Sequence, residues 1–362
     1  MIKILIGGSP CTKWSIAQSK DRETTAAGIG WELFENYLFA KEKFRPDLFL
    51  YENNKSAAQP IKDQISEELD VDLMYINSSL VSAQNRQRFY GFNWTVPQPQ
   101  DRGIMLNDIL ESGESWLEKS YAYTTRCNGA IPEDTLKRHR HTMVAERITE
   151  ASWDLIPGAK IFVTERALRQ GDEKGTKQGK YVYLHSAEKT NAILAGQAHN
   201  EKVIVPAPEG KWKTIYEVRN GRIEINGSFY EINLSDGFYI IRKLTVTEAC
   251  RLQTLPDNYC RAVSDAQAYK GIGNGWTAEV IIHILAGALS SIPRNEKLLV
   301  LSMYDGIGTG RYCLEKMGFT NVEYHAYEID KYAMRVANSN YADIIQHGDA
   351  FQLRESGWSL YR

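Results

Sequence analysis

The sequence has few cysteines, no long apolar run and no excess of basic residues. Its five cysteines are scattered and odd in number, without Cys-x-x-Cys or Cys/His spacing, which argues against disulfides and against a zinc site. No apolar run approaches the roughly 20 residues of a membrane span, and the chain opens without a signal-peptide pattern. We therefore expect a cytoplasmic protein that holds no metal and has no membrane partner.

The overall charge is close to neutral. Lysine and arginine number 43 against 45 acidic residues, a formal net charge of −2, which argues against indiscriminate nucleic-acid binding but leaves room for a basic cleft. With 43% hydrophobic residues the chain can build full cores, and a length of 362 residues suggests two domains.

Residues 1–98 alternate apolar strands with helices, a pattern typical of an α/β fold with a parallel sheet. Cys11 and Glu52 each follow one of these strands, and ligands gather at the carboxyl ends of parallel strands. We expect strands at 3–7, 47–51, 71–77 and 89–94, and helices at 31–44 and 58–69.

Between residues 101 and 240 this rhythm is lost. The dipeptides Asn220-Gly221 and Asn226-Gly227 favour hairpin turns between three β segments of 213–233. Further short elements are expected upstream, a strand at 121–126 and a helix at 133–148. Because Pro97 and Pro99 mark a boundary, we expect a smaller, turn-rich second domain.

The chain then returns to helices and finally to an α/β pattern. Thr245 and Glu248 form a capping box that opens a helix, and a second helix is expected at 277–289. After a polar linker at 290–297, we expect strands at 298–303, 322–327 and 344–347, with a helix ending at Met317 and another at 331–340.

The last stretch carries the features of a nucleoside site. The turn Gly306-x-Gly308-x-Gly310 follows an apolar strand, and Glu328 lies 20 residues after Gly308, the distance at which a carboxylate binds ribose hydroxyls. Asp349 follows a third strand and suits an adenine amino group. Two acids with few cations fit S-adenosylmethionine, which lacks phosphates, better than a dinucleotide, although an ordinary α/β turn is the simpler alternative.

Two further groups carry chemistry. Cys11 ends the stretch Gly7-Gly8-Ser9-Pro10-Cys11, a strand that breaks into a tight turn and presents one thiol. Taken alone, a free cysteine is more often an inert buried residue. Arg86 and Arg88 lie on one side of an extended chain, where two guanidinium groups suit a phosphate or a flipped base, with an exposed charged edge as the alternative.

Taken together, these motifs resemble the DNA (cytosine-5) methyltransferases. The resemblance covers both ends of the chain and omits only the middle. It rests on Gly7-Gly8-Ser9-Pro10-Cys11, Glu52-Asn53, Gln84-x-Arg86-x-Arg88, Arg242-x-Leu244-Thr245-x-x-Glu248-x-x-Arg251-Leu252-Gln253, Gly273-Asn274, Tyr304-Asp305-Gly306-Ile307-Gly308-Thr309-Gly310, Glu328 and Gly348-Asp349.

The order of the motifs departs from the usual one in this family. Most members carry the S-adenosylmethionine strands before the Pro-Cys strand, whereas here they come last. The chain therefore resembles a circularly permuted member of the restriction–modification or phage type. The implied fold is a Rossmann-like methyltransferase mixed sheet with helices on both faces, plus a smaller α+β or β target-recognition domain.

The resemblance implies four domain segments. Residues 1–98 would be the catalytic half of the methyltransferase domain and 99–240 the target-recognition domain. Residues 241–290 would supply return helices, and 291–362 the S-adenosylmethionine-binding half.

The resemblance also implies a catalytic constellation. Cys11 would attack C6 of a flipped cytosine, and Glu52 would bind N3 and the amino group and supply a proton. Arg86 and Arg88 would hold the base oxygen and the adjacent phosphate, with Arg88 on the base. Segment 18–30 would close over the flipped base.

Cofactor and DNA contacts follow from the same resemblance. The implied S-adenosylmethionine residues are Tyr304, Asp305, Gly306, Gly308, Thr309, Gly310, Glu328, Ile329, Asp349, Asn274 and Trp276. The implied contacts to double-stranded DNA are Ser9, Gln84, Arg126, Lys137, Arg138 and Arg140, although 137–141 fit a solvated helix face equally well.

Other functions remain open at this point. An RNA cytosine C5-methyltransferase of the same fold is one, but the tRNA-acting branch has Pro-Pro-Cys and a Cys-Phe-Thr element where this chain has Ser9-Pro10-Cys11 and no such element. A catalytically silent DNA-binding homologue is another. We expect a monomer or weak dimer, in a prokaryotic nucleoid or a phage-infected cell.

Overall fold

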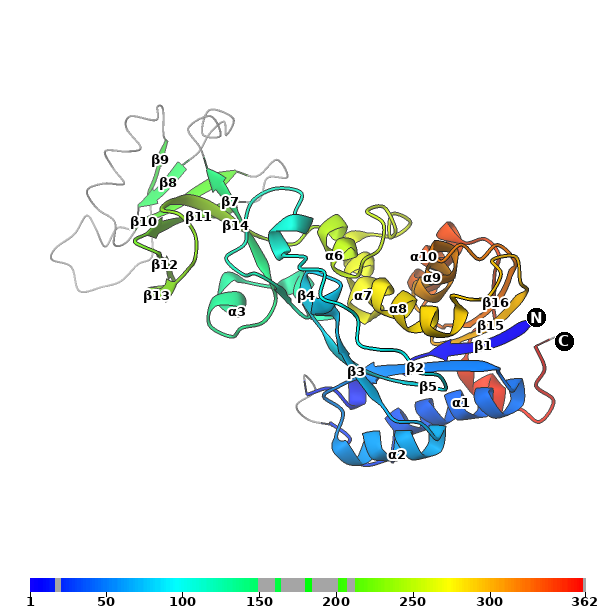
Figure 1. Ribbon diagram of the computed structural model, residues 1–362. Coiled ribbons are helices and arrows are strands. Elements are labelled where there is room, and N and C mark those ends of the chain that lie inside the picture. The colour runs from blue at the N-terminus through cyan, green and yellow to red at the C-terminus, as the bar shows by residue number, and fades with distance from the viewer. Residues whose placement is uncertain (17–20, 149–159, 164–179, 184–200, 207–211, 361–362) are drawn as a thin grey trace. The chain divides into compact units, whose positions relative to one another are not determined.

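A seven-stranded sheet organises the first of two units into which the chain divides (Figure 1). The structure is a computed structural model that describes residues 1–16, 21–148, 160–163, 180–183, 201–206 and 212–360. Unit 1 comprises residues 1–109, 119–128 and 245–362, and unit 2 comprises 110–118 and 129–244.

The sheet of unit 1 brings strands from the two ends of the chain side by side. All six residues of β1 (Ile2–Gly7) pair in parallel with β15 (Leu298–Met303). Parallel pairing continues on both sides, to β2 (Leu48–Asn54) and to β16 (Val322–Tyr327). The full order is β17 (Ile344–Gln346), β16, β15, β1, β2, β5 (Gln87–Phe92) and β3 (Met74–Asn77).

One strand of this sheet departs from the parallel pattern that residues 1–98 alone indicated. The last strand expected there, 89–94, corresponds to β5, which runs antiparallel to both β2 and β3. The connection 78–86 explains the difference, because a parallel return needs a crossover of about a dozen residues or more. The α/β fold class and the mixed sheet that the resemblance implies are both confirmed.

Helices cover both faces of this sheet (Figure 1). One face packs on α1 (Ile29–Phe44) and α2 (Gln59–Leu69), through a core that includes Phe34, Tyr37 and Tyr51. Each such aromatic side chain stabilises the fold by about 1.5–3 kcal/mol through burial. The other α-helices described in unit 1 are α6 (Val246–Leu252), α7 (Asp265–Asn274), α8 (Ala278–Leu289), α9 (Thr309–Lys316) and α10 (Lys331–Asn340).

Two of these helices form the one described stretch that is long and apolar enough to cross a membrane. It spans residues 265–289, is broken between α7 and α8, and is a little over half buried within the structure.

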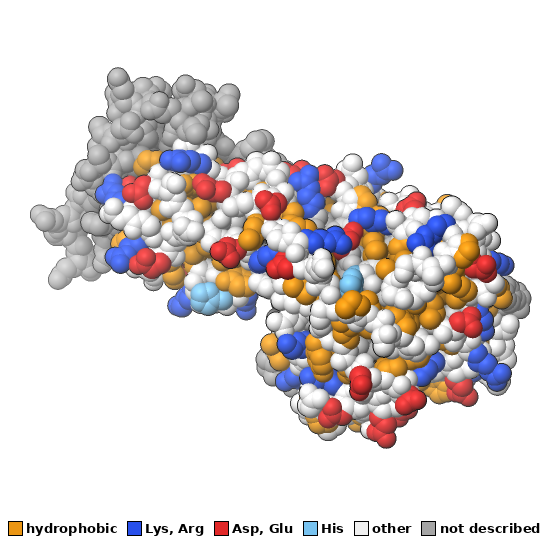
Figure 2. Space-filling view, viewed as in Figure 1, with side chains coloured by type: hydrophobic (Ala, Val, Ile, Leu, Met, Phe, Trp, Pro, Cys, Tyr) orange, Lys and Arg blue, Asp and Glu red, His pale blue; other side chains and the backbone are white. Residues whose placement is uncertain are grey.

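On the surface, Figure 2 shows acidic and basic side chains interspersed over the viewed face.

Unit 2 is built on an antiparallel sheet. Its strand β14 (Gly237–Lys243) pairs with β7 (Met143–Ile148) and β11 (Trp212–Arg219), and β11 continues into β12 (Arg222–Ile225) and β13 (Ser228–Glu231). The two predicted Asn-Gly hairpin turns are confirmed, since all four of their residues have positive φ. The sheet also contains β8 (Lys160–Val163), β9 (Lys180–Tyr183) and β10 (Glu201–Pro206).

Two other expectations for the middle of the chain are wrong. Residues 133–148 do not form one helix: α3 (Pro132–Leu136) ends early, and β7 follows. His139 and His141 adopt left-handed φ values of 49° and 55°, which a helix cannot continue through. The expected strand 121–126 is replaced by β6 (Ser120–Tyr121), followed by a 3₁₀ helix at Thr125–Gly129.

Candidate active site

The Cys11 loop lies directly against the strand that carries Glu52. β1 ends at Gly7, and Cys11 opens a 3₁₀ helix, Cys11–Lys13. A Cβ on Gly8 would lie 2.6 Å from the Glu52 carbonyl oxygen and 2.9 Å from its Oε2. A glycine is required at this position because any side chain would push the loop off β2. Cys11 is partly exposed, whereas the other four cysteines are buried.

A buried polar network fixes this loop in place. Ser9 Oγ and Tyr51 Oη share a hydrogen bond of 2.7 Å, and Asn53 Nδ2 donates to the Ser9 carbonyl at 3.0 Å and to Tyr51 Oη at 2.9 Å. Burial raises the pKa of Tyr51 well above its usual value, so the phenol stays neutral. The Ser9 side chain is buried and bonded within the network, and the DNA contact expected at Ser9 stays a prediction.

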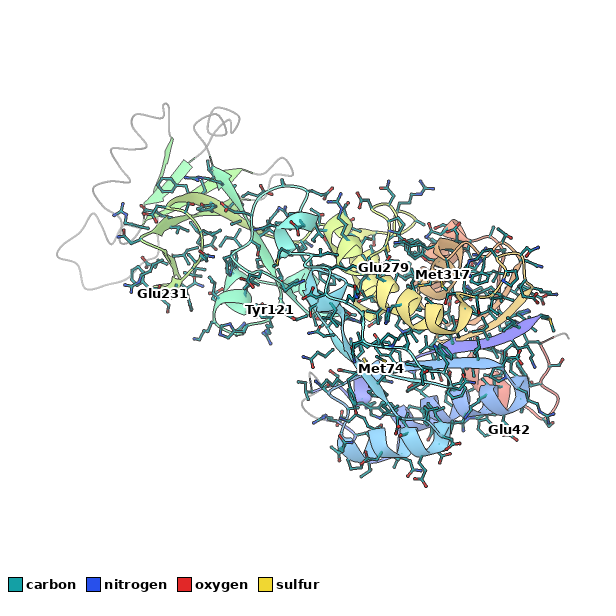
Figure 3. The ribbon with its side chains drawn as sticks, viewed as in Figure 1. Glu42, Met74, Tyr121, Glu231, Glu279 and Met317 are labelled. Carbon is teal, nitrogen blue, oxygen red and sulfur yellow. The ribbon has the colours of Figure 1, made fainter. Side chains whose placement is uncertain are left out.

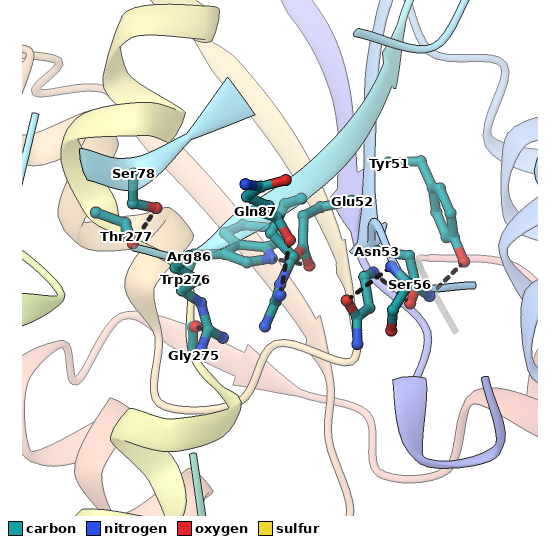
Figure 4. A network of polar contacts seen from close by, with 12 residues as sticks. Tyr51, Glu52, Asn53, Ser56, Ser78, Arg86, Gln87, Gly275, Trp276 and Thr277 are labelled. Carbon is teal, nitrogen blue, oxygen red and sulfur yellow. Dashed lines mark hydrogen bonds and ion pairs between the residues drawn. The ribbon is translucent and has the colours of Figure 1, made fainter. Parts of the chain in front are cut away.

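The Glu52 carboxylate is held by two donors. Arg88 Nε lies 2.9 Å from Oε1, and Trp276 Nε1 donates to Oε2 at 2.9 Å (Figure 4). Glu52 pairs with Tyr90 across the β2–β5 ladder, which makes Arg88 its diagonal neighbour on the same face. The sequence prediction assigned Trp276 to the cofactor pocket, whereas its indole N–H is committed to Glu52.

The Arg86 guanidinium is bonded to backbone carbonyls in this structure, and its predicted contact with a base oxygen or phosphate stays a prediction. Arg86 lies between β4 (Gln84–Asn85) and β5, outside regular strand geometry, and its side chain is 4% exposed. Its guanidinium donates to the carbonyls of Tyr123 (2.9 Å), Gly273 (3.2 Å) and Gly275 (2.9 Å). Burial, and then the neighbouring Arg88, lowers the pKa of Arg86 to about 9. Arg86 therefore ties the 273–275 segment to the sheet.

We expect Arg86→Met to reduce the free energy of unfolding by about 3 kcal/mol, because three carbonyls would lose a charged donor. Arg88→Met should cost about 1 kcal/mol, since Arg88 is partly solvated and its contacts are fewer. Urea denaturation measures both variants. Equal losses of unfolding free energy in Arg86→Met and Arg88→Met would contradict the inference that Arg86, and not Arg88, is the structural residue.

Gln84 is also a structural residue. It is fully buried, its Nε2 donates to the Leu252 carbonyl at 2.7 Å and to Gln253 Oε1 at 3.0 Å, and its Oε1 accepts from the Tyr123 N–H. The DNA contact expected at Gln84 stays a prediction. Gln253 in turn accepts from Thr277 Oγ1 at 2.8 Å and donates to the Ile272 carbonyl. Two glutamines thus join α6, α7 and α8 to β4.

The carboxyl ends of β15 and β16 carry a second group of predicted residues. The Gly306 N–H donates to Glu328 Oε2 at 2.9 Å, and Oε1 accepts from the Ile329 and Asp330 N–H groups at 2.8 and 2.7 Å. Gly306 has a φ of 63°, and nothing lies within 4 Å of the position of a Cβ. Ile329 is 74% exposed beside it. A fixed carboxylate, an open glycine and an exposed apolar side chain fit a nucleoside ligand.

Asp305 adds an incompletely bonded carboxyl group. Oδ1 accepts from Ser302 Oγ at 2.7 Å and from Tyr324 Oη at 2.6 Å, while Oδ2 is buried without a partner in the part of the chain that is described. Burial raises the pKa of Asp305 to about 6, against those two hydrogen bonds and with help from Glu328. An orphan acceptor at this edge fits a ligand that carries a donor or a positive charge, as S-adenosylmethionine does.

We expect Asp305→Asn to stabilise unit 1 at neutral pH. An acid with a raised pKa stays protonated in the fold while the unfolded chain ionises near pH 4, so stability falls as the pH rises from about 4 to about 6. The amide does not titrate, and the gain at pH 7.5 should reach about 2 kcal/mol. Thermal unfolding between pH 4.5 and 8 measures it, and parallel profiles for both proteins would contradict the expectation.

Four residues in or next to the glycine turn that were predicted to bind the cofactor are packed against other parts of unit 1 or hydrogen-bonded to them. They are Tyr304, Gly308, Thr309 and Gly310. A Cβ on Gly310 would lie 2.5 Å from Ile6 Cδ1, and one on Gly308 would lie 3.0 Å from Ala337 Cβ, so close packing explains both glycines. Thr309 is buried, with no described partner for its Oγ1. Tyr304 turns its hydroxyl to α1, where it donates to the Leu33 carbonyl at 2.7 Å and accepts from Asn36.

The remaining predicted residues differ in their surroundings. Asp349 and Asn274 are exposed, and Asp349 caps a 3₁₀ helix, Ala350–Arg354, by accepting from the Phe351 N–H. In unit 2, Arg138 and Arg140 are half exposed and both bind Asp134 at 2.8 Å. These ion pairs hold the pKa of Asp134 well below its usual value despite its burial. Lys137 is exposed, and the Arg126 side chain lies outside the described part of the chain.

Two more points bear on the chemistry. Within the described residues, no group of three His, Cys, Asp or Glu side chains is arranged to hold a metal ion.

The segment 18–30 is described from residue 21 onward, and there Glu23 accepts from the Trp14 indole at 3.1 Å and from the Gly30 N–H. Gln18 lies outside the described residues.

Comparison with known proteins supplies the family. The family model for C-5 cytosine-specific DNA methylase matches residues 1–289. Type II methyltransferase M.HpaII of Haemophilus parainfluenzae is 27% identical over 75% of this chain and 67% of its own length. Type II methyltransferase M1.ScrFI of Lactococcus lactis subsp. cremoris is 26% identical over 81% of this chain, which spans 64% of that relative.

Further relatives are a phage enzyme and a solved structure. Orphan methyltransferase M.SPBetaI of Bacillus phage SPbeta is 26% identical over 76% of this chain and 71% of its own length. A crystal structure of a mutant Spodoptera frugiperda DNMT2 is 14% identical, covers 78% of each chain and has a TM-score of 0.37. The family model spans well over half of the sequence, and its class of enzyme is the DNA (cytosine-5-)-methyltransferase. The chain belongs to the C-5 cytosine-specific DNA methylase family.

Proposed function

We propose that this protein methylates C5 of a flipped cytosine in double-stranded DNA through a covalent adduct with Cys11. One observation carries the proposal. The Cys11 loop packs on the backbone of Glu52, and the Glu52 carboxylate is fixed by Arg88 and Trp276. A thiol and an oriented carboxyl group on adjacent strands can act on one ring from two sides.

The reaction balances with these groups. The Cys11 thiolate forms a bond to C6, and Glu52 gives a proton to N3, so that charge does not build up on the ring. C5 becomes nucleophilic, and S-adenosylmethionine, when bound, supplies the methyl group for it. Solvent takes the C5 proton, the C6–S bond breaks, and N3 returns its proton to Glu52. Arg88, which is partly exposed beside Glu52, is the residue we assign to the base oxygen.

The base must leave the duplex for this chemistry, since C6 is unreachable in a stacked pair. Segment 18–30 is proposed to close behind it. For the cofactor, we assign the ribose hydroxyls to Glu328, one adenine face to Ile329 and the adenine amino group to Asp349. The open Gly306 and the unpartnered Asp305 Oδ2 support a ligand at this edge.

Target recognition is proposed for residues 99–240, most of which lie in unit 2. Lys137, Arg138 and Arg140 are its candidate phosphate contacts, with Arg126 beside them in sequence. We also propose that the protein acts as a monomer or weak dimer in the cytoplasm of a bacterium or a phage-infected cell. The names of the relatives support a restriction–modification or phage setting.

We propose in addition that the chain is a circular permutation of the usual family order. Two observations support this. The family match ends at residue 289, before the glycine turn, and β15 nevertheless pairs with β1 along its whole length. An experimental structure in which strand 298–303 is not parallel and adjacent to strand 3–7 would refute the proposal.

The test of function is direct. The protein is incubated with isotopically labelled S-adenosylmethionine and either duplex DNA or RNA of mixed sequence, and the digested nucleosides are analysed by mass spectrometry. We expect labelled 5-methyldeoxycytidine from duplex DNA. Label in RNA alone would favour the RNA methyltransferase, and no label in either, with DNA still bound, would favour a silent homologue.

A further inference from the structure

The indole of Trp276 holds the proposed acid, Glu52, from the side opposite Arg88. Trp276 Nε1 donates to Oε2 and Arg88 Nε lies on Oε1, each at 2.9 Å, and the Glu52 side chain is 12% exposed. Two donors on different oxygens fix both the position and the rotation of a carboxyl group. An indole N–H is a neutral group that donates and cannot accept, so the carboxyl group must be the acceptor in this contact.

The backbone that carries this indole is held on both sides. The Gly275 carbonyl, just before Trp276, accepts from Arg86 at 2.9 Å. Thr277, just after it, bonds to Gln253 Oε1 at 2.8 Å and to Ser78 Oγ at 2.9 Å (Figure 4). The buried network around Arg86 and Gln253 therefore sets where the indole N–H points.

We propose that Trp276 is a positioning residue for Glu52, which keeps the carboxyl group in the orientation that meets N3 of the flipped cytosine. This rests on the proposed function. It differs from a role in the cofactor pocket, and the two roles act at separable stages. Addition of Cys11 at C6 and protonation at N3 need no cofactor, whereas methyl transfer does.

The cofactor-independent stage has its own readout. Once C6 is bonded to sulfur and N3 is protonated, C5 takes a proton from solvent, then loses either proton as the C6–S bond breaks. The net change is exchange of the C5 hydrogen with water. Release of tritium from duplex DNA labelled at C5 of cytosine, without S-adenosylmethionine, therefore reports on the base site, with Cys11 and Glu52, and not on the cofactor.

Trp276→Phe keeps the aromatic packing and removes the donor. We expect tritium release to fall roughly 10- to 100-fold, the loss of one hydrogen bond to a charged group. The dissociation constant of S-adenosylmethionine, by calorimetry, should stay within about twofold. Trp94→Phe is the matched control, because it removes an indole N–H that donates to the Ile284 carbonyl at 2.8 Å in the same unit. It should leave exchange unchanged.

Trp276→His tests whether the donor or the bulk matters. The imidazole keeps an N–H donor on a smaller ring, so Trp276→His should recover part of the tritium release that Trp276→Phe loses. Equal losses in the Phe and His variants would overturn the proposal, as would unchanged exchange with weakened cofactor binding. No exchange by the wild-type protein, together with no methylation, would contradict the proposed function itself, and this inference would fall with it.

Discussion

Replacing Cys11 by serine should abolish methylation and covalent trapping together. The hydroxyl of serine is a far weaker nucleophile than a thiolate, and loss of a nucleophile costs roughly 10³-fold or more in rate. Duplex DNA that carries 5-fluorocytosine should form a denaturation-resistant adduct with the wild-type protein in the presence of S-adenosylmethionine. Fluorine at C5 cannot leave as a proton does, so the C6–S bond persists. Cys11→Ser should give no adduct, while it still binds DNA.

The other cysteines supply the control. Cys127 is buried in the same unit, where it accepts from the Thr124 N–H, and Cys127→Ser should trap DNA as the wild type does. Because Cys11 is the partly exposed cysteine, a thiol reagent should label one equivalent in the native protein and none in Cys11→Ser. An adduct that forms with Cys11→Ser would exclude Cys11 as the nucleophile.

The sequence predicted the strands that matter but not every direction. Continuous apolar runs identified β1, β2 and β15, because strands buried on both faces need such runs. The direction of β5 depends on the length of its connection, which the apolar pattern of the strands does not encode. The basic run within residues 133–148 looks helical by composition. In the structure a turn lies there instead, together with the ion pairs of Arg138 and Arg140 with Asp134.

Side-chain direction was harder to predict than position. Arg86 and Arg88 are two residues apart, and an extended strand would place both on one side. Arg86 lies in the break between β4 and β5, and carbonyls of 123, 273 and 275 accept hydrogen bonds from its guanidinium. The same holds for Ser9 and Gln84, whose partners come from distant segments. The contact between Trp276 and Glu52 spans 224 positions and leaves no local signal.

Glu52→Gln is the second large effect that we expect. It removes the proton donor for N3, and positioned acids typically contribute 10²–10⁴-fold, so methylation should fall by roughly 10³-fold. The amide also disturbs the site, because Arg88 and Trp276 both point N–H groups at this side chain. The glutamine oxygen can accept from one of them, and its NH₂ group faces the other. We therefore expect a loss of about 1–2 kcal/mol in unfolding free energy as well.

Glu279→Gln is the control that separates the loss of methylation rate from the loss of unfolding free energy. Glu279 lies on α8 (Figure 3), its side chain is also 12% exposed, and Arg102 and Lys316 hold it at 2.8 and 2.6 Å. These partners lower the pKa of Glu279 against its burial, so its substitution costs stability above pH 5 without touching the base site. Rates of methylation and of adduct formation on 5-fluorocytosine DNA should be near wild type for Glu279→Gln and depressed for Glu52→Gln. Equal rates after correction for the folded fraction would mean that Glu52 contributes structure alone, and that the proton for N3 comes from elsewhere.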